Sequence, residues 1–198
     1  MRFFGNAARG AAIAVVASMA FQGTAHASQA TDFVDHLGHE MVAVLNSSQS
    51  MDQKRRDFVP IVDHNVNIPA IARYCLGRYW RTATPAQREE YVRLFKAVML
   101  NAVLVQMGQY TNISYTLLGS VPSPDGEKVT LQITRPGQDP VTMTVVVAGQ
   151  PPKLVDIYGE GASMRLTQRT DYTSFLSRHG GNVQTLIDAL QRKVNAGN

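Results

Sequence analysis

The hydrophobic pattern of this 198-residue chain changes its period near the middle and later changes back. Up to about residue 109, apolar residues recur every three to four positions, as on one face of a helix. From Ile113 to Tyr158 they alternate with polar residues, as in half-buried strands, and from about Ala162 the helical spacing returns. Strands grouped between two sets of helices predict an α+β fold.

The alternating segment predicts a four-stranded antiparallel meander. Its strands are separated by three turns rich in proline, glycine and polar residues, at 121–126, 136–140 and 149–152. Because the turns are short, consecutive strands are expected to pair. Leu131 and Ile133 in one strand, and Met143 and Val145 in the next, alternate with polar side chains. We therefore expect one apolar face and one threonine-rich face.

Helical spacing predicts four helices before the sheet and two after it. Their approximate ranges are 31–48, 52–64, a short helix after Asn67, 85–109, 162–178 and 182–194. Pro60 is expected to kink or split the second helix. These helices should pack against the sheet, and the long fourth helix should face it.

Residues 76–95 predict a helix end, a tight connection and the start of a long second helix. Gly77 suits the position just past a helix terminus. Thr84 is a favourable N-cap, Pro85 fits the first helical position, and Gln87 completes a capping box.

The first 27 residues have the pattern of a secretory signal peptide. Arg2 and Arg9 provide the positive start, residues 11–21 form the apolar centre, and Ala27 ends an A-x-A cleavage site. We therefore expect an exported protein whose residues 28–198 form a single domain.

Charge and cysteine content exclude several classes of function. Removing the two signal-peptide arginines lowers the formal charge from +4 to +2 (17 basic against 15 acidic residues), which is too small to indicate nucleic-acid binding. No basic stripe is interleaved with aromatics. A lone cysteine, Cys75, cannot form an internal disulfide, and its apolar neighbours predict a packed thiol. The basic run 54–56 predicts a solvated helix face. No glycine-rich loop that could cradle a nucleotide phosphate is present.

Four segments together resemble one protein family. They are the Leu-Gly-Arg-Tyr-Trp-Arg and Thr-Pro-Ala-Gln-Arg motifs within 76–95, Asp-Ile-Tyr-Gly-Glu-Gly-Ala-Ser at 156–163, Gln-Arg-Thr-Asp-Tyr at 168–172, and Leu-Ile with a following leucine at 186–190. This set resembles the MlaC family, also called the toluene-tolerance family of periplasmic phospholipid-binding proteins. The resemblance extends from about Asn67 to Val194. Asn67 stands where the family usually has aspartate, and Pro152 replaces a frequent tryptophan.

The resemblance implies that sheet and helices enclose an apolar cavity for acyl chains, in a carrier that is not an enzyme. It implies phospholipid as the bound ligand and no cofactor. The implied partners are an inner-membrane ABC transporter complex, with its membrane-anchored substrate-binding-type subunit, and an outer-membrane lipoprotein complex. The implied role is lipid shuttling in the periplasm that maintains outer-membrane asymmetry.

The candidate pocket residues are apolar or aromatic side chains from the fourth helix, its approach and two strands. They are Tyr79, Trp80, Phe95, Met99, Val103, Met107, Leu131, Ile133, Met143 and Val145. Taken from the residues alone, the same set could form an ordinary packed core, and Tyr79 and Trp80 could be aromatic packing at a helix corner.

Asp156 opens an enzymatic alternative, because it is a charged residue inside an apolar strand. It could be the general base of a small cone-shaped α+β isomerase or dehydratase. Strand alternation places it on one face with Leu154, and pairing with an arginine such as Arg169 would explain it without catalysis. Arg169 is also a candidate for contacting a lipid headgroup.

Three further alternatives involve a metal, another lipid or no ligand. His36 and His39 lie three residues apart and could approach one metal ion, but no third ligand is evident and both are expected to face water. We therefore expect no metal site. A carrier for another lipid, such as a hopanoid, and a lipid-free adaptor fit the same sequence.

Overall fold

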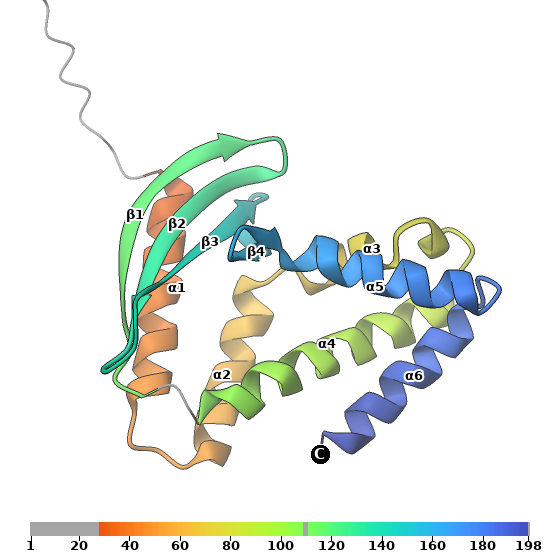
Figure 1. Cartoon of the computed structure of the whole chain (residues 1–198), viewed down its shortest axis with the longest axis horizontal. Helices are drawn as coiled ribbons and strands as arrows, with labels where there is room; N and C mark the ends of the chain where they lie inside the picture. Colours follow the sequence, from red (N-terminus) through yellow and green to blue (C-terminus); the bar gives the residue numbers. More distant parts are fainter. Residues whose placement is uncertain (1–27, 109–110, 198) are drawn as a thin grey trace, which may run out of the picture.

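The structure is a computed structural model that describes residues 28–108 and 111–197; the expected signal peptide lies outside these ranges. The elements, in chain order, are α1 (Gln29–Asn46), α2 (Met51–Asn65), α3 (Ile68–Leu76), the 3-10 helix η1 (Gly77–Trp80), α4 (Pro85–Met107), β1 (Ser114–Ser123), β2 (Gly126–Thr134), β3 (Val141–Ala148), β4 (Lys153–Gly159), β5 (Ala162–Ser163), α5 (Met164–Arg178) and α6 (Val183–Ala196). The predicted α+β fold is confirmed (Figure 1). Within the described ranges, no helix combines the length and the apolar character needed to span a bilayer.

The sheet is an antiparallel meander in the order β1-β2-β3-β4-β5. The prediction of four strands was wrong by one, because Ala162 and Ser163 fold back onto the end of β4 instead of starting a helix. Glu160 and Gly161 make this return possible, since both have positive φ values, +50° and +79°. Two residues are too few for alternation to reveal a strand.

The helix ends follow the predicted capping chemistry. The Asn67 side chain accepts a hydrogen bond from the backbone N–H of Ala70 at 3.2 Å. Thr84 and Gln87 form the expected capping box, with reciprocal bonds of 3.2 and 3.1 Å. The α2 helix runs through Pro60 without being split; an interior proline removes one backbone hydrogen bond, but here the helix continues.

Buried apolar side chains form two clusters. The sheet core joins α1 to the apolar face of the sheet and contains Ala30, Val34, Val129, Leu131, Val145, Val147 and Leu154. The helix core fills the space among α2 to α6, and its largest fully buried members are Phe58, Leu76, Tyr91, Leu94, Met107, Leu176 and Ile187. Val66 packs against both clusters. Figure 1 shows α1 lying along the sheet, with α3 to α6 grouped beside it.

Two helices differ from the packing expected from sequence. The helix that packs against the apolar face of the sheet is α1, whereas α4 packs mainly against α6 and α3. Lys54, predicted on a solvated face, is buried with 6% of its surface exposed. Its ammonium group donates to the carbonyl of Leu45 at 2.7 Å, in the last turn of α1, where a cation complements the helix dipole.

A register shift in the sheet changes which residues of β4 share a face. Val146 of β3 pairs with Asp156, but the next residue, Val147, pairs with Leu154, so Val155 is left over. Adjacent residues of β3 point to opposite faces, and cross-strand partners share a face. Leu154 and Asp156 therefore lie on opposite faces of the sheet. The alternation argument, which placed them together, was wrong because it assumed a regular strand.

Candidate functional site

The structure distributes the predicted pocket residues between the two cores. Helix-core members are Tyr79, Trp80, Phe95, Met99 and Met107. Sheet-core members are Leu131, Ile133, Met143 and Val145. Val103 belongs to neither cluster, and 42% of its surface is exposed. The structure therefore divides the candidate residues into two groups, one in each core, and leaves Val103 outside both.

The sheet core has an incompletely covered edge. Partly buried apolar side chains pack around it, and we call this set the apolar rim: Phe33, Leu37, Leu117, Ile133, Met143 and Ile157. One helix is about 10–12 Å wide with its side chains. Neighbouring strands are about 4.8 Å apart, so α1 alone cannot cover the full width of the sheet. Apolar side chains that stay partly exposed in this way can accept an apolar ligand at little cost.

The helix core is closed by comparison. Tyr91, Phe95 and Tyr172 meet in tilted and edge-to-face arrangements, with ring centroids 6.0 to 6.4 Å apart. The hydroxyl of Tyr91 donates to the carbonyl of Ala72 at 3.0 Å. Aromatic contacts of this geometry, together with the satisfied hydroxyl, favour a single packed arrangement. Phe95 is therefore held in a well-filled interior.

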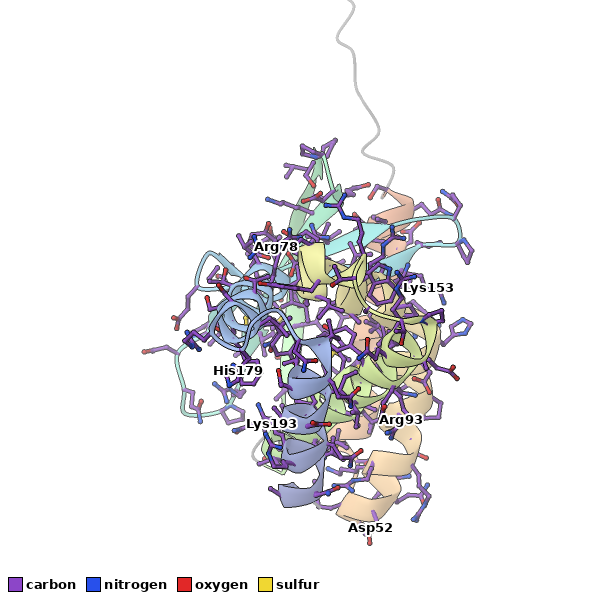
Figure 2. The ribbon with its side chains drawn as sticks, turned by 90° about the vertical axis from the view of Figure 1, so that its right-hand side faces the viewer. Asp52, Arg78, Arg93, Lys153, His179 and Lys193 are labelled. Carbon is purple, nitrogen blue, oxygen red and sulfur yellow. The ribbon has the colours of Figure 1, made fainter. Side chains whose placement is uncertain are left out.

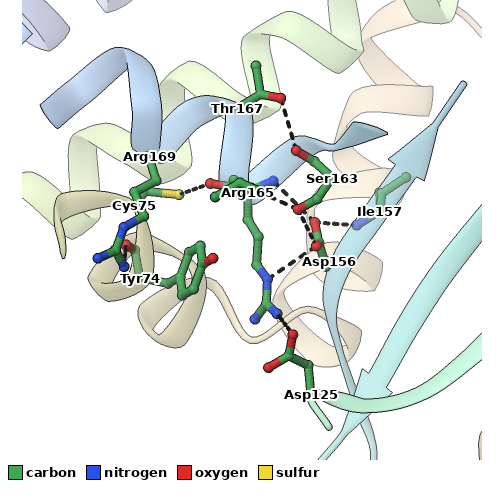
Figure 3. A network of polar contacts seen from close by, with 10 residues as sticks. Tyr74, Cys75, Asp125, Asp156, Ile157, Ser163, Arg165, Thr167 and Arg169 are labelled. Atoms are coloured by element: carbon green, nitrogen blue, oxygen red, sulfur yellow. Dashed lines mark hydrogen bonds and ion pairs between the residues drawn. The ribbon is translucent and has the colours of Figure 1, made fainter. Parts of the chain in front are cut away.

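Asp156 lies at the centre of a buried polar network (Figure 3). Only 3% of its surface is exposed. Its carboxylate accepts hydrogen bonds from the Ile157 and Arg165 backbone N–H groups at 2.8 and 3.1 Å. The Ser163 hydroxyl donates at 2.6 Å and the Arg165 Nε at 3.2 Å. Another nitrogen of Arg165, Nη2, lies 2.7 Å from a carboxylate oxygen of Asp125 in the β1–β2 turn.

This network explains Asp156 without catalysis. Its carboxylate oxygens receive four donors from the protein, so the group is buried, paired and hydrogen-bonded, as a buried charge must be. A general base needs access to a substrate proton, which this carboxylate lacks. The network instead joins β4, β5, α5 and the β1–β2 turn.

The arginine partner predicted for Asp156 was wrong: it is Arg165 rather than Arg169. Arg169 donates from Nη1 to the carbonyl of Tyr74 at 3.1 Å. The guanidinium groups of Arg165 and Arg169 lie 4.4 and 4.9 Å from the centroid of the Tyr74 ring. The two arginines are four residues apart on one face of α5. The spacing identifies an arginine-bearing face, but only the short β5 turn brings Arg165 to Asp156.

The two histidines of α1 point to different partners. The Nε2 of His36 lies 3.6 Å from Glu40, while the Nδ1 of His39 lies 2.9 Å from both the Asp35 carbonyl and the Tyr115 hydroxyl. Across residues 28–108 and 111–197, no group of three or more His, Cys, Asp or Glu side chains is arranged to hold a metal ion.

Cys75 is the packed thiol that the sequence predicts. It is fully buried, and its Sγ lies 3.5 Å from the carbonyl of Arg165, to which it donates. Burial raises the pKa of the Cys75 thiol to about 12. Because the thiolate is the reactive form, this cysteine is inert near neutral pH.

The arrangement of an antiparallel meander beside a helical group occurs in a solved phospholipid-binding protein. That protein, from Ralstonia solanacearum, was determined in complex with a phospholipid, and its fold superimposes with a TM-score of 0.75. The two chains are 18% identical over an alignment that covers 86% of this chain and 99% of the other. A family model described as MlaC protein matches residues 35–192. The chain belongs to the MlaC family.

Proposed function

We propose that this protein is a periplasmic phospholipid carrier. The observation that carries the proposal is the apolar rim of the sheet core, in a fold whose Ralstonia relative holds a phospholipid. Membership of the MlaC family supports the same assignment. The Asp156 carboxylate is buried and already accepts four hydrogen bonds from the protein, which argues against the isomerase or dehydratase alternative.

The physical requirement for such a carrier is large. Transfer of the tails of a diacyl phospholipid, with about 30 methylene groups, from the bilayer into water would cost about 24 kcal/mol of free energy, at about 0.8 kcal/mol per CH₂. Uncatalysed passage between two membranes is therefore prohibitive. A carrier has to provide an apolar surface that replaces the bilayer interior while leaving the polar headgroup near solvent.

In the proposed complex the acyl tails contact the apolar rim and the adjoining sheet-core side chains. Leu131, Ile133, Met143 and Val145 form the sheet wall, and Met99 contributes from the helical side. Met143 and Met99 are both partly buried, and their flexible thioethers adapt to tails of different shape. The predicted tail contacts with weaker support lie within the helix core, at its corner or outside both clusters; they are Tyr79, Trp80, Phe95, Met107 and the exposed Val103.

The partners follow from the proposed transport. A carrier moves lipid only down a gradient of binding free energy, so direction has to be imposed by the complexes that load and unload it. We place the carrier in the periplasm after removal of residues 1–27. Its proposed partners are an outer-membrane lipoprotein complex and an inner-membrane ABC transporter complex, and its proposed role is to maintain outer-membrane lipid asymmetry.

Native mass spectrometry of freshly purified protein tests the central claim. We expect a bound species with the mass of a phospholipid. Met143→Asp should abolish lipid retention while the far-UV circular dichroism persists, because a carboxylate in the rim would have to be desolvated against acyl chains. Leu131→Asp should behave similarly, although its position is more deeply buried.

Thr142→Asp is the matched control, since Thr142 is exposed and next to Met143 on the opposite face of β3. It introduces the same charge and should retain lipid. Equal retention by Met143→Asp, Thr142→Asp and the wild-type protein would remove the rim from the binding site. Bare protein in every preparation would favour a lipid-free adaptor, and a mass corresponding to a hopanoid would change the ligand class.

A further inference from the structure

Two adjoining hollows lie between η1 and the second half of α5. Figure 1 shows these two elements at the end of the molecule away from the sheet. Their volumes are about 520 and 570 Å³, within the range of small-molecule sites. Arg78 and Ser177 line both hollows. We call the combined feature the arginine groove and define it by Arg78, Arg81, Arg169, Arg178, Ser174 and Ser177.

Among the described residues, no carboxylate forms an ion pair with the arginines of the groove. Four arginines line it, and no aspartate or glutamate does. Two arginines outside the groove do form ion pairs: Arg165 contacts two carboxylates, and Arg93 lies 3.8 Å from Glu90. None of the groove arginines forms an ion pair within the described part of the chain. Since the formal charge of the whole chain is only +4, this concentration is local.

Two of the guanidinium groups are held in place by neutral aromatic and backbone contacts. Arg169 is fixed by the Tyr74 carbonyl and ring, and a side chain at Gly77 would approach its guanidinium to 3.3 Å. The guanidinium of Arg78 lies 4.9 Å from the centroid of the Tyr79 ring, and its Nη2 donates to the Tyr79 hydroxyl at 2.9 Å. Each arginine has five N–H donors, so most remain available to a ligand.

The chemistry of this groove matches a phosphate group. Guanidinium forks bind phosphate oxygens through paired, charge-assisted hydrogen bonds, and the hydroxyls of Ser174 and Ser177 add neutral donors. We propose that the arginine groove is a binding site for the phosphate group of a phosphoester. The phosphate could belong to a lipid headgroup in a membrane or to a soluble phosphoester, and both present the same charged oxygens.

The groove is separate from the apolar rim. Figure 2 shows Arg78 of η1 and His179, which follows the end of α5, on the face turned toward the viewer. Its lining includes no sheet residue. Phosphate binding here does not rest on the proposed carriage of lipid tails, and either property can fail without the other.

Calorimetric titration and vesicle flotation test the site and distinguish the two sources of phosphate. The soluble probes are inorganic phosphate and glycerol 3-phosphate. The membrane probes are vesicles of phosphatidylglycerol, compared with vesicles of digalactosyldiacylglycerol, which has no phosphate. The test protein is the double variant Arg78→Gln/Arg178→Gln. Its matched control is Arg55→Gln/Arg192→Gln, which removes two exposed arginines outside the groove.

We expect the groove variant to bind phosphate at least tenfold more weakly than the wild-type protein, while the control variant stays within about twofold. Loss of binding to the soluble probes identifies a soluble phosphoester site. Loss confined to phosphatidylglycerol vesicles identifies a headgroup site. Equal binding by the groove and control variants, or no binding of the wild-type protein to any phosphate probe, overturns the proposal. Lipid retention measured by native mass spectrometry should be unchanged in both variants.

Discussion

The sheet region and the helix region of this protein bury their apolar residues to different degrees. In the helix core Ala72, Cys75, Leu76, Tyr91 and Leu94 are all 0% exposed. In the sheet core only Val129 reaches that value, and the apolar rim around it is partly open. Partly buried apolar side chains border both cores, but the helix core has a larger set of fully buried members, as in a close-packed interior.

This difference indicates which region can change shape. A filled interior loses dispersion contacts whenever its members move apart, so the helix core resists rearrangement. The rim residues have fewer neighbours to lose and gain apolar contacts from a ligand. A frame that is rigid on one side and incomplete on the other suits a protein that takes up an apolar molecule and releases it intact.

The largest expected effect is on the helix core. Leu94→Ala should lower the free energy of unfolding by about 4 kcal/mol, because it removes buried methyl groups and leaves a cavity. Ile133→Ala in the rim should cost less than about 2 kcal/mol, because the site is partly solvated and can relax. Urea denaturation of lipid-free protein provides the measurement. Equal losses in the two variants would contradict the difference in packing.

An intermediate effect is expected where the two regions are joined by the Asp156 network. Arg165→Met should lower the free energy of unfolding by about 3 kcal/mol, since it leaves a buried carboxylate without its cationic partner. Arg169→Met is the control, because Arg169 contacts the same Tyr74 ring but no carboxylate. It should cost less than about 1 kcal/mol. A similar loss in both variants would assign the effect to packing on Tyr74.

The smallest effect concerns Tyr115 in the sheet region. Burial, followed by its hydrogen bond to Asp35, raises the pKa of Tyr115 to about 12, compared with about 10 in an unfolded chain. The folded state therefore holds this proton more tightly. Its contribution to stability is complete below about pH 10 and is lost as the pH rises toward 12.

Tyr115→Phe isolates that contribution. The difference in unfolding free energy between wild-type and variant protein should be constant below about pH 10 and should shrink above it. Burial also raises the pKa values of Tyr91 and Tyr172 in the helix core, but both tyrosines are present in both proteins and cancel in the comparison. A difference that stays constant to pH 12 would mean that the Tyr115 pKa is not raised.

Local features of the fold were predictable because their signals lie within a few residues. Asn67, Thr84 and Gln87 specify helix starts through side chains that reach only to the next turn. Alternation identified the four longer strands and their meander order, because short turns leave few other ways to pair them. The family resemblance was confirmed by the match over residues 35–192.

Features that depend on distant partners were not predictable. Both α1 and α4 carry enough apolar residues to pack against a sheet, and neither segment contains a signal that shows which of them does so. Arg165 and Arg169 are equivalent by spacing, and only the β5 turn separates their roles. The arginine groove brings Arg78 and Arg178 together from distant parts of the sequence, and neither has a local signal that marks it as part of a site.

The extra residue in β4 places Leu154 and Asp156, two positions apart on one short strand, on opposite faces of the sheet. Because Val155 has no partner in the register, Leu154 turns toward the valines under α1 while Asp156 turns toward Arg165. If β4 kept Val155 but paired with β3 in a regular register, Leu154 and Asp156 would share one face, and a carboxylate on the face of Leu154 would point into the apolar layer under α1. In that register the Arg165 guanidinium would have no Asp156 carboxylate to bind, and this link between α5 and the strands would be missing.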